Sequence, residues 1–167
     1  MNPLSYGFVS QAKQDFHING KVLDIGSKNI NGTVRPIFFD CEYIGLDMSE
    51  GDNVDIVCNS HSLPYPDNTM DCVVSVGTLE HDDKFWLTIE EVKRVLKPGG
   101  YGLFTVPSIG FPKHDYPHDY WRFTTDAFES MFDGWEKQTT PAEMEVVCWA
   151  IKPQVKQGSK IAVERRL

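Results

Sequence analysis

Acidic and small residues follow two short apolar runs, at places where a turn could meet a ligand. Asp24-Ile25-Gly26-Ser27 closes the first run, and Gly26 permits a tight turn whose following amides can face an anionic group. Asp47, in the segment GLDMS, closes the second run, where a carboxylate accepts hydrogen bonds from ribose hydroxyls. The alternatives are an ordinary turn at Gly26 and a solvated loop aspartate at Asp47.

A third polar segment, CNSHSLPYPDNTMD, follows the next apolar run. It places Asn59 and Ser60 beside Leu63 and Tyr65. Polar groups next to apolar walls are suited to holding a flat base.

Titratable side chains that can take a proton from a hydroxyl occur later in the chain. The candidates are His81, His114, Asp115, His118 and Asp119. For His81 the alternative is a residue at a helix entry that hydrogen-bonds the backbone. His114 and His118 have the i, i+4 spacing of a metal pair. Pro117 between them disfavours a helix and no HExxH glutamate is present, so no metal site is expected.

Aromatic residues surround the last of these groups. They are Tyr116, Tyr120, Trp121 and Phe123. They can form an apolar lid over a substrate. Alternatively, Trp121 and Phe123 pack the loop onto the body of the protein while Arg122 pairs with an acidic neighbour.

The cysteines do not form a metal or disulfide framework. Cys41, Cys58, Cys72 and Cys148 contain no CxxC pair, and the first three lie in or beside apolar runs. Buried, reduced thiols are therefore expected.

Short apolar runs bounded by Gly, Asp, Asn or Pro must position these groups, and they read as buried strands of a parallel sheet. The runs are 22–25, 43–46, 54–57, 72–76 and 102–106. Between the last two, Phe85, Ile89, Val92 and Leu96 recur on one helical face. Asp82 or Asp83 is expected to cap this helix, and Lys97-Pro98-Gly99-Gly100 to stop it.

The rest of the chain adds a second helix and two closing strands. Residues 124–132 predict the helix, and 135–139 with 143–151 predict the strands. Only seven residues, 47–53, separate the second and third strand runs, too few for a helical crossover. A loop must connect them, and one face of the sheet is expected to be thinly covered or covered by a partner.

Length and charge narrow the classes of function. The 167 residues suit a single domain over 1–151, followed by a basic, flexible tail over 152–167. The net charge of -8 disfavours a large nucleic acid as partner. No apolar run approaches the roughly 20 residues of a membrane span, and no signal segment opens the chain, so a cytoplasmic location is expected.

Four segments in order carry a resemblance to a known family. They are VLDIGS, YIGLDMS, SLPYPDNTMDCVVSVGTLEH and EEVKRVLKPGGYGLFTVPS. With them the chain resembles the class I S-adenosylmethionine-dependent methyltransferases, in their small-molecule branch, from about residue 22 to 108 and more loosely to 151. The stretch HDYPHDYWRFT resembles a subset of that family.

The resemblance implies an α/β, Rossmann-like methyltransferase fold, trimmed between strands 2 and 3, with a mostly parallel sheet and a C-terminal antiparallel strand pair. It implies S-adenosylmethionine as cofactor, methyl transfer to a small-molecule or saccharide-type acceptor at oxygen or nitrogen, and His81, His118 and Asp119 as the catalytic candidates. The implied cofactor-binding residues are Asp24, Gly26 and Ser27 at the methionine part, Asp47 at the ribose, Met48 at the adenine edge, Asn59 and Ser60 at the adenine amino side, and Gly77 at the inner wall.

The first motif departs from the family pattern. Lys28 and Ile30 stand where the family usually carries two further glycines. Asn29, Asn31 and Gly32 can supply left-handed residues instead, and Lys28 can pair with the cofactor's carboxylate. This departure motivates an alternative of another class, a noncatalytic methyltransferase-like binding or scaffold subunit.

Three enzyme classes are disfavoured by motifs the chain lacks. A nicotinamide oxidoreductase would need GxGxxG, and a nucleic-acid amino-methyltransferase would need Asn or Asp-Pro-Pro-Tyr after the fourth strand. A cytosine C5 enzyme would need a Pro-Cys nucleophile.

Overall fold

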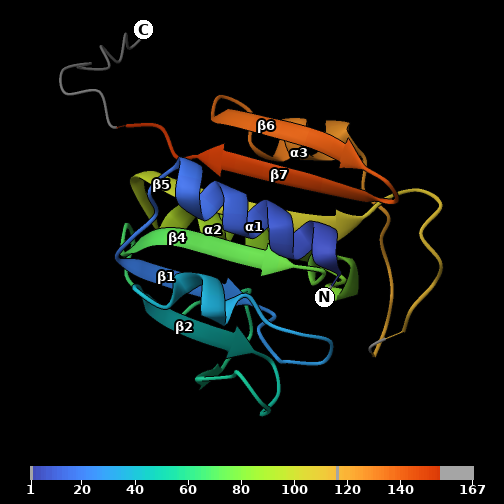
Figure 1. Cartoon of the computed structure of the whole chain (residues 1–167), viewed down its shortest axis with the longest axis horizontal. Helices are drawn as coiled ribbons and strands as arrows, with labels where there is room; N and C mark the ends of the chain where they lie inside the picture. The colour runs from blue at the N-terminus through green and yellow to red at the C-terminus, as the bar shows by residue number, and fades with distance from the viewer. Residues whose placement is uncertain (1, 116, 155–167) are drawn as a thin grey trace, which may run out of the picture.

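A seven-stranded sheet organises the chain in this computed structural model, which describes residues 2–115 and 117–154 (Figure 1). The strands are β1 (Lys21–Ile25), β2 (Glu42–Asp47), β3 (Ile56–Val57), β4 (Met70–Val76), β5 (Leu96–Pro107), β6 (Glu136–Ala142) and β7 (Glu145–Ile151). Their order across the sheet is β3-β2-β1-β4-β5-β7-β6.

The first five strands are parallel, and β7 runs antiparallel to both of its neighbours, β5 and β6. The predicted α/β sheet with an antiparallel C-terminal strand pair is confirmed. Four of the five predicted apolar runs lie inside β1, β2, β4 and β5. The remaining run, 54–57, is shorter in the structure, because β3 begins only at Ile56.

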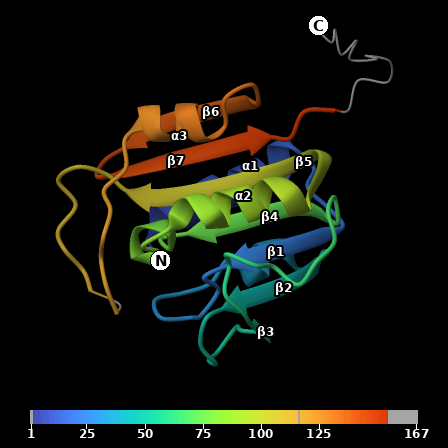
Figure 2. The ribbon, with the colours of Figure 1, turned by 180° about the vertical axis from the view of Figure 1, so that it is seen from behind.

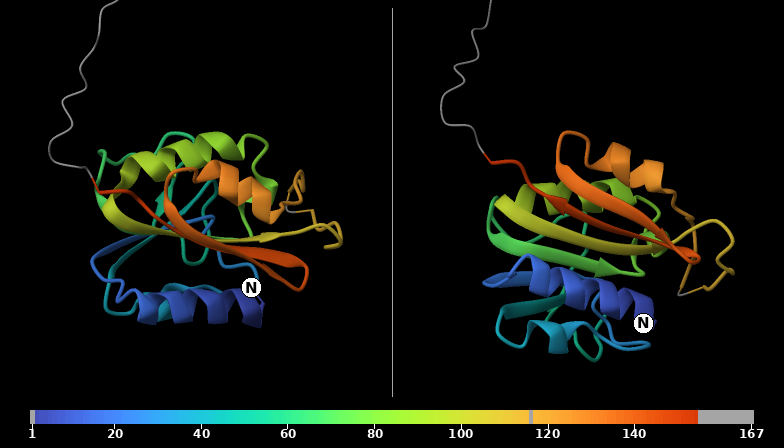
Figure 3. Two further views of the ribbon diagram at one scale, coloured as in Figure 1. Left: turned by 90° about the horizontal axis from the view of Figure 1, so that it is seen from above. Right: turned by 45° about the horizontal axis from the view of Figure 1, so that its top comes forward.

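Helices cover both faces of the sheet (Figure 3). The helices α2 (Phe85–Val95) and α3 (Thr125–Met131) lie on one face, which is turned toward the viewer in Figure 2, where α2 crosses in front of β4 and β5. Ile89 and Val92 are buried there, as their spacing predicts, and Leu96 continues the same apolar cluster as the first residue of β5. Burial of each such side chain stabilises the fold by about 1.5–3 kcal/mol.

The start of α2 differs from the expectation that Asp82 or Asp83 caps it. Lys84 is the N-cap residue, and no side chain makes the cap hydrogen bond. Asp82 acts from two residues earlier, where its carboxylate accepts bonds from the Lys84 N–H (2.9 Å) and the Thr88 hydroxyl (2.6 Å).

The other face carries α1 (Pro3–Asp15) and the short 3-10 helix η1 (Arg35–Phe38). The sequence did not predict a helix at α1, because its apolar pattern is weak and only Val9 and Ala12 are buried apolar residues. Its start is nonetheless encoded: the Asn2 side chain accepts from the Ser5 N–H (2.8 Å) and Pro3 holds the first helical position. The face expected to be thin is thus covered by the chain itself.

The connections between β1, β2 and β3 are short. A loop over residues 48–55 joins β2 to β3, as expected, and η1 replaces a full crossover helix between β1 and β2. Residues 108–124 form a long loop that projects from the edge toward which the arrows of β2 and β4 point (Figure 1).

All four cysteines are free thiols in the structure. Cys72 and Cys148 are buried, and burial raises the pKa of the Cys148 thiol to about 12. Cys41 and Cys58 are only half-buried. No helix in the described ranges has the length and hydropathy needed to cross a membrane.

Lys152, the residue directly after β7, is held by hydrogen bonds to the end of α2 and the start of β5. Lys152, expected to begin the tail, donates from Nζ to the backbone oxygens of Lys93 (2.6 Å) and Leu96 (2.7 Å). The remainder of the expected tail, 155–167, lies outside the described residues.

Candidate functional site

The carboxyl ends of β1, β2, β3 and β4 lie at one edge of the sheet, since these strands pair in parallel. Each is followed by expected cofactor-binding residues. Gly26 and Ser27 follow β1, Met48 follows Asp47 at the end of β2, Asn59 and Ser60 lie just past β3, and Gly77 directly follows β4. The sheet topology therefore brings the segments of the predicted site together.

Gly26 makes the turn after β1 with a φ of +78°. A Cβ at this position would lie 2.1 Å from Oγ1 of Thr78, so only glycine lets the loop approach the segment after β4. The amides of Gly26 and Ser27 both donate to the backbone oxygen of Leu46, at 2.9 and 3.0 Å. The expectation that these amides face an anion is therefore not met: they hold β1 to β2.

In the loop after β1, Lys28 and Ile30 stand in place of the family's glycines. Of the three residues expected to be left-handed there, one is. Gly32 has a φ of +115°, whereas Asn29 and Asn31 do not adopt a positive φ. Their expected left-handed geometry is wrong, since the loop is held instead by hydrogen bonds: Asn29 donates through its backbone N–H and its amide to Asp52, at 2.9 and 2.7 Å.

Asp47 presents a held carboxylate at the edge. Its Oδ1 accepts from the backbone N–H (3.0 Å) and hydroxyl (3.2 Å) of Ser49, and its Oδ2 accepts from the Lys28 N–H (3.4 Å). Three of the four acceptor positions of the carboxylate are taken, so Oδ2 can accept one further bond, and a ligand hydroxyl can replace the Ser49 hydroxyl on Oδ1. The Lys28 ammonium, expected near the cofactor's carboxylate, donates to the Ser49 hydroxyl at 3.1 Å.

Asp24 lies deeper than its neighbours, with 4% of its surface exposed. The Tyr43 hydroxyl donates to its carboxylate. Burial raises the pKa of Asp24 to about 7, against the lowering effect of that hydrogen bond and of the Arg35 charge. The Asp24 carboxyl is therefore buried against the Tyr43 hydroxyl.

The remaining cofactor candidates differ in how free their side chains are. Met48 is 68% exposed. The Asn59 side chain accepts from the His61 N–H (2.8 Å), and the Ser60 hydroxyl is bonded to that of Thr88 (2.8 Å). Gly77 has a φ of +59° and its N–H donates to Thr105 at 2.9 Å.

A cluster of one carboxylate and two imidazoles lies beside Gly77. The Glu80 carboxylate oxygen Oε1 is 3.5 Å from Nε2 of His114 and 3.8 Å from Nε2 of His81. The two rings are edge-on, with centroids 4.9 Å apart. Glu80 is 1% exposed, and burial raises the pKa of its carboxyl to about 8.

Glu80 is a residue that the sequence reasoning missed. It was visible only as part of the LEH motif, because no spacing rule relates residue 80 to residue 114. The long loop makes the contact: the N–H of Tyr120 donates to the Glu80 backbone oxygen at 2.8 Å, which holds the loop against the short 3-10 helix η2 (Leu79–His81).

His118 and Asp119 are placed differently from His81. Both guanidinium nitrogens of Arg122 donate to Asp119, at 2.5 and 2.6 Å, and this hydrogen bonding holds the pKa of the Asp119 carboxyl well below its usual range. His118 is exposed, with its ring 5.6 Å from that of Tyr120. Its backbone oxygen accepts from Nδ1 of His81.

The aromatic residues divide between the two expected roles. The Trp121 indole donates to the Asp82 backbone oxygen (2.8 Å), and its ring is 5.5 Å from that of Phe85. Phe123 is buried in the core cluster. Both pack the loop onto the body of the protein, whereas Tyr120 is 48% exposed. Tyr116 lies outside the described residues.

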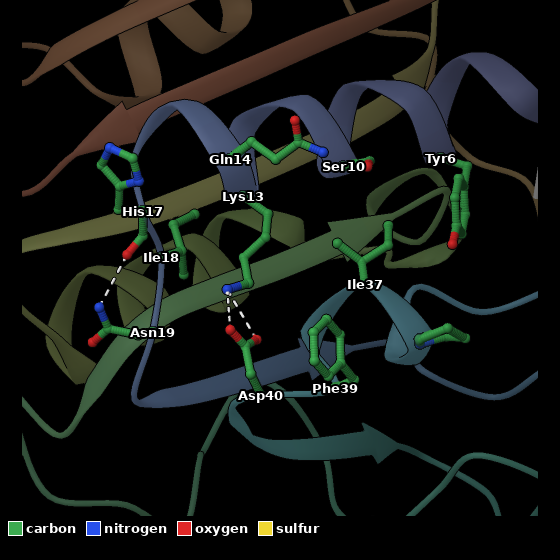
Figure 4. Close-up of a pocket in the computed structure, with 11 residues that line it drawn as sticks. Tyr6, Ser10, Lys13, Gln14, His17, Ile18, Asn19, Ile37, Phe39 and Asp40 are labelled. Atoms are coloured by element: carbon green, nitrogen blue, oxygen red, sulfur yellow. Dashed lines mark hydrogen bonds and ion pairs between the residues drawn. The ribbon is translucent and has the colours of Figure 1, made fainter.

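A hollow of about 520 Å³ lies elsewhere, between α1 and η1 (Figure 4). His17, Ile18 and Asn19, which line one end of it, precede β1. The Lys13–Asp40 ion pair, 3.0 Å, crosses it. Its position on the α1 face and toward the amino end of β1 separates it from the predicted site.

Comparison with known proteins gives a consistent family. A family model described as "Methyltransferase domain" matches residues 23–104. The fatty-acid O-methyltransferase of Mycolicibacterium smegmatis is 35% identical over 95 residues, covering 57% of this chain and 30% of that protein. Curated relatives also include tRNA methyltransferases. The chain spans 19% to 30% of the length of the curated relatives it matches.

Solved structures share the fold. The YcgJ protein of Bacillus subtilis superposes with a TM-score of 0.72 at 15% identity, covering 92% of this chain and 100% of that chain. The 1,6-didemethyltoxoflavin-N1-methyltransferase of Burkholderia thailandensis, solved with bound S-adenosylhomocysteine, superposes with a TM-score of 0.69 at 15% identity, covering 91% of this chain and 78% of that chain.

Proposed function

Since the chain belongs to the class I S-adenosylmethionine-dependent methyltransferase family, whose methyl donor is S-adenosylmethionine, we propose that it transfers that methyl group to a small-molecule or saccharide-type acceptor, at oxygen or nitrogen. One observation carries the proposal. The held Asp47 carboxylate, the glycine turn at Gly26 and the glycine at 77 lie at the carboxyl ends of adjacent parallel strands.

The proposed cofactor contacts follow from this edge. Asp47 accepts hydrogen bonds from the ribose hydroxyls, and the exposed Met48 side chain lies along the adenine edge. Asn59 and Ser60 border the adenine amino side. Gly26, Ser27 and Gly77 form the walls near the methionine part, with Asp24 supporting the turn from below through Tyr43.

Methyl transfer is an in-line displacement at a sulfonium. The acceptor lone pair forms the new bond to the methyl carbon, and the C–S bond breaks with its electron pair returning to sulfur, which becomes a neutral thioether. The acceptor's proton is lost to a base or to water. Because the sulfonium makes the donor reactive, the protein's contribution is alignment and exclusion of water.

The acceptor side is proposed to be formed by η2 and the loop of residues 108–124. Of the proposed catalytic residues His81, His118 and Asp119, His81 is the one whose ring faces the Glu80 carboxylate beside Gly77, with 3.8 Å between Nε2 and Oε1. Asp119 is held by Arg122 and is better suited to positioning the loop. His118 reaches the cluster only through its backbone oxygen.

Calorimetric titration with S-adenosylmethionine and with S-adenosylhomocysteine tests the proposal. Binding of either, followed by a mass gain of about 14 Da on one of a panel of sugars, lipids and metabolites, the mass of a CH2 unit, supports an enzyme. A noncatalytic scaffold subunit, the alternative favoured by the occupied amides of Gly26 and Ser27, should bind neither.

The same assay with transfer RNA tests the expectation that the acceptor is not a nucleic acid. The net charge of -8 supports a small acceptor, since it repels a phosphate backbone. Methylated RNA in place of a methylated small molecule would contradict the proposal.

A further inference from the structure

We propose that Glu80, His81 and His114 form a binding site for a divalent first-row metal ion such as Zn²⁺. The proposal departs from the expectation from the sequence that no metal site is present, an expectation that considered only the pair His114 and His118. One ligand atom from each of the three residues lies within 4.8 Å of the other two.

The distances suit a shared cation. A zinc ion takes imidazole nitrogens and carboxylate oxygens at about 2.0–2.2 Å, in tetrahedral geometry. Two ligand atoms on such an ion are roughly 3.4 Å apart, which follows from that bond length and the tetrahedral angle. The Glu80 Oε1 distances to the two Nε2 atoms, 3.5 and 3.8 Å, are close to this separation.

The outer contacts of both imidazoles leave Nε2 directed at Glu80. A carbonyl oxygen only accepts, so Nδ1 of His81 carries the proton that is donated to His118, and Nε2 keeps a lone pair. Nδ1 of His114 lies 3.3 Å from Oδ2 of Asp119, which Arg122 holds in place; the two atoms are close but do not form a hydrogen bond in this arrangement. Metal-binding histidines in proteins have this arrangement, with a carbonyl or carboxylate behind the ligating ring.

Glu80 supplies the second observation. Its Oε2 atom is buried and has no hydrogen-bond partner among the described residues, and only 1% of the surface of Glu80 is exposed. A buried polar atom without a partner costs about 1–3 kcal/mol. A cation bound at Oε1, which faces the imidazoles, offsets the cost of burying this carboxylate through its charge. The His114 side chain is 39% exposed and gives an ion access to the cluster.

The site borders the proposed cofactor site. A Cβ placed on Gly77 would lie 3.5 Å from Oε1 of Glu80. Three protein ligands leave a coordination position open, as in catalytic zinc sites. That position suits an oxygen of the acceptor, a role that rests on the proposed function, whereas metal binding itself does not.

The test is zinc binding by untagged protein treated with a chelator and dialysed. Calorimetry with ZnCl₂ and elemental analysis are expected to give one ion per chain. Co²⁺ in place of zinc is expected to give the visible absorption of a four- or five-coordinate nitrogen–oxygen site. A chain that retains neither metal overturns the proposal.

Matched variants assign the ligands. Glu80→Gln, His81→Gln and His114→Gln are each expected to weaken zinc binding more than about a hundredfold, and Asp119→Asn, which removes an outer contact, about ten- to a hundredfold. His17→Asn, which removes an exposed imidazole outside the cluster, should bind as the natural protein does. Equal losses in His17→Asn would overturn the assignment.

The two proposals fail separately. Zinc binding is measured without cofactor, and S-adenosylmethionine binding is measured in the presence of chelator. Zinc bound without any affinity for the cofactor would contradict methyl transfer alone, and the reverse result would contradict the metal site alone.

Discussion

At the scale of single residues, the site depends on carboxylates in unlike surroundings. Asp47 is half-buried and held by the Ser49 and Lys28 backbone amides, whereas Asp24 is buried against one phenol. Asp119 is paired with a guanidinium. The same side-chain chemistry therefore provides a ligand contact, a support and a loop anchor.

Asp47→Ala is expected to weaken binding of S-adenosylmethionine by roughly 1 to 3 kcal/mol, or about five- to a hundredfold. The reason is that one held carboxylate accepts from two ribose hydroxyls. Calorimetry measures the change, with Glu50→Ala as the control, because Glu50 is exposed and lies three residues further on. Unchanged affinity in Asp47→Ala would show that the ribose binds elsewhere.

The raised pKa of Asp24 predicts that the free energy of unfolding depends on pH. Its pKa is raised from 3.8 to about 7, with Tyr43, Arg35 and Asp47 as the facing groups. Between those values the folded chain keeps the proton and the unfolded chain loses it, so stability falls as the pH rises and levels off above about 7.

The comparison of urea unfolding at pH 5 and pH 8 tests this, using cofactor-free protein. Between pH 5 and pH 8 the natural chain is expected to lose about 2 to 3 kcal/mol of its free energy of unfolding through Asp24. Asp24→Asn, whose amide oxygen can still accept from Tyr43, should not show this loss. Glu80 titrates alike in both proteins, so the difference isolates Asp24. Identical pH profiles would contradict the raised pKa.

At the scale of elements, the loop of residues 108–124 has a free portion and an anchored portion. The N–H groups of Tyr120 and Phe123 donate to the backbone of residues 80 and 107, at 2.8 and 3.0 Å. Ile109 and Gly110 are exposed. The Phe111 and His114 N–H groups donate to Ser108 (3.1 Å) and Asp119 (2.8 Å), so the free portion is short and lies at the start of the loop.

Hydrogen exchange of the cofactor-free protein should reflect this division. We expect Ile109 and Gly110 to exchange much faster than β4 and β5. Phe111, His114, Tyr120 and Phe123 should be intermediate, because their amides are bonded. Protection at Ile109 and Gly110 equal to that of the central strands would contradict a mobile start of this loop.

Tyr120 and Trp121 are neighbours with different expected effects. Trp121→Ala should destabilise the fold by about 1–3 kcal/mol, because it removes packing on Phe85 and the bond to Asp82. Tyr120→Ala should lower turnover of the acceptor found by mass spectrometry, with cofactor affinity and stability nearly unchanged. Equal loss of turnover and cofactor binding in Tyr120→Ala would assign it a structural role.

At the scale of the whole molecule, the domain proposed to end at residue 151 includes Lys152. Besides the bonds of its ammonium, the Lys152 N–H donates to Gly100 at 2.9 Å and its oxygen accepts from Gly99 at 2.8 Å. These contacts tie the last strand to the end of α2 and the start of β5.

Two truncations test this boundary. A chain ending at Gln154 should unfold at the same urea concentration as the full chain, while one ending at Ile151 should lose about 1–3 kcal/mol, since a bond to a charged group is worth about that much. Lys152→Met separates the ammonium from the backbone contacts. Equal stability of the two truncated chains would return the boundary to 151.

The sequence by itself determined the strand runs, the α2 face and the family, because each depends on local periodicity and on motifs close together in the chain. Asp47 and Gly26 could be placed at one sheet edge for the same reason, since parallel strands carry their ends to a common side. Only the tertiary structure decided α1, whose two buried apolar residues give too weak a period to read. It alone brought His114 to Glu80 and His81, because a contact across 34 positions depends on how the long loop folds back onto η2, which no local pattern encodes.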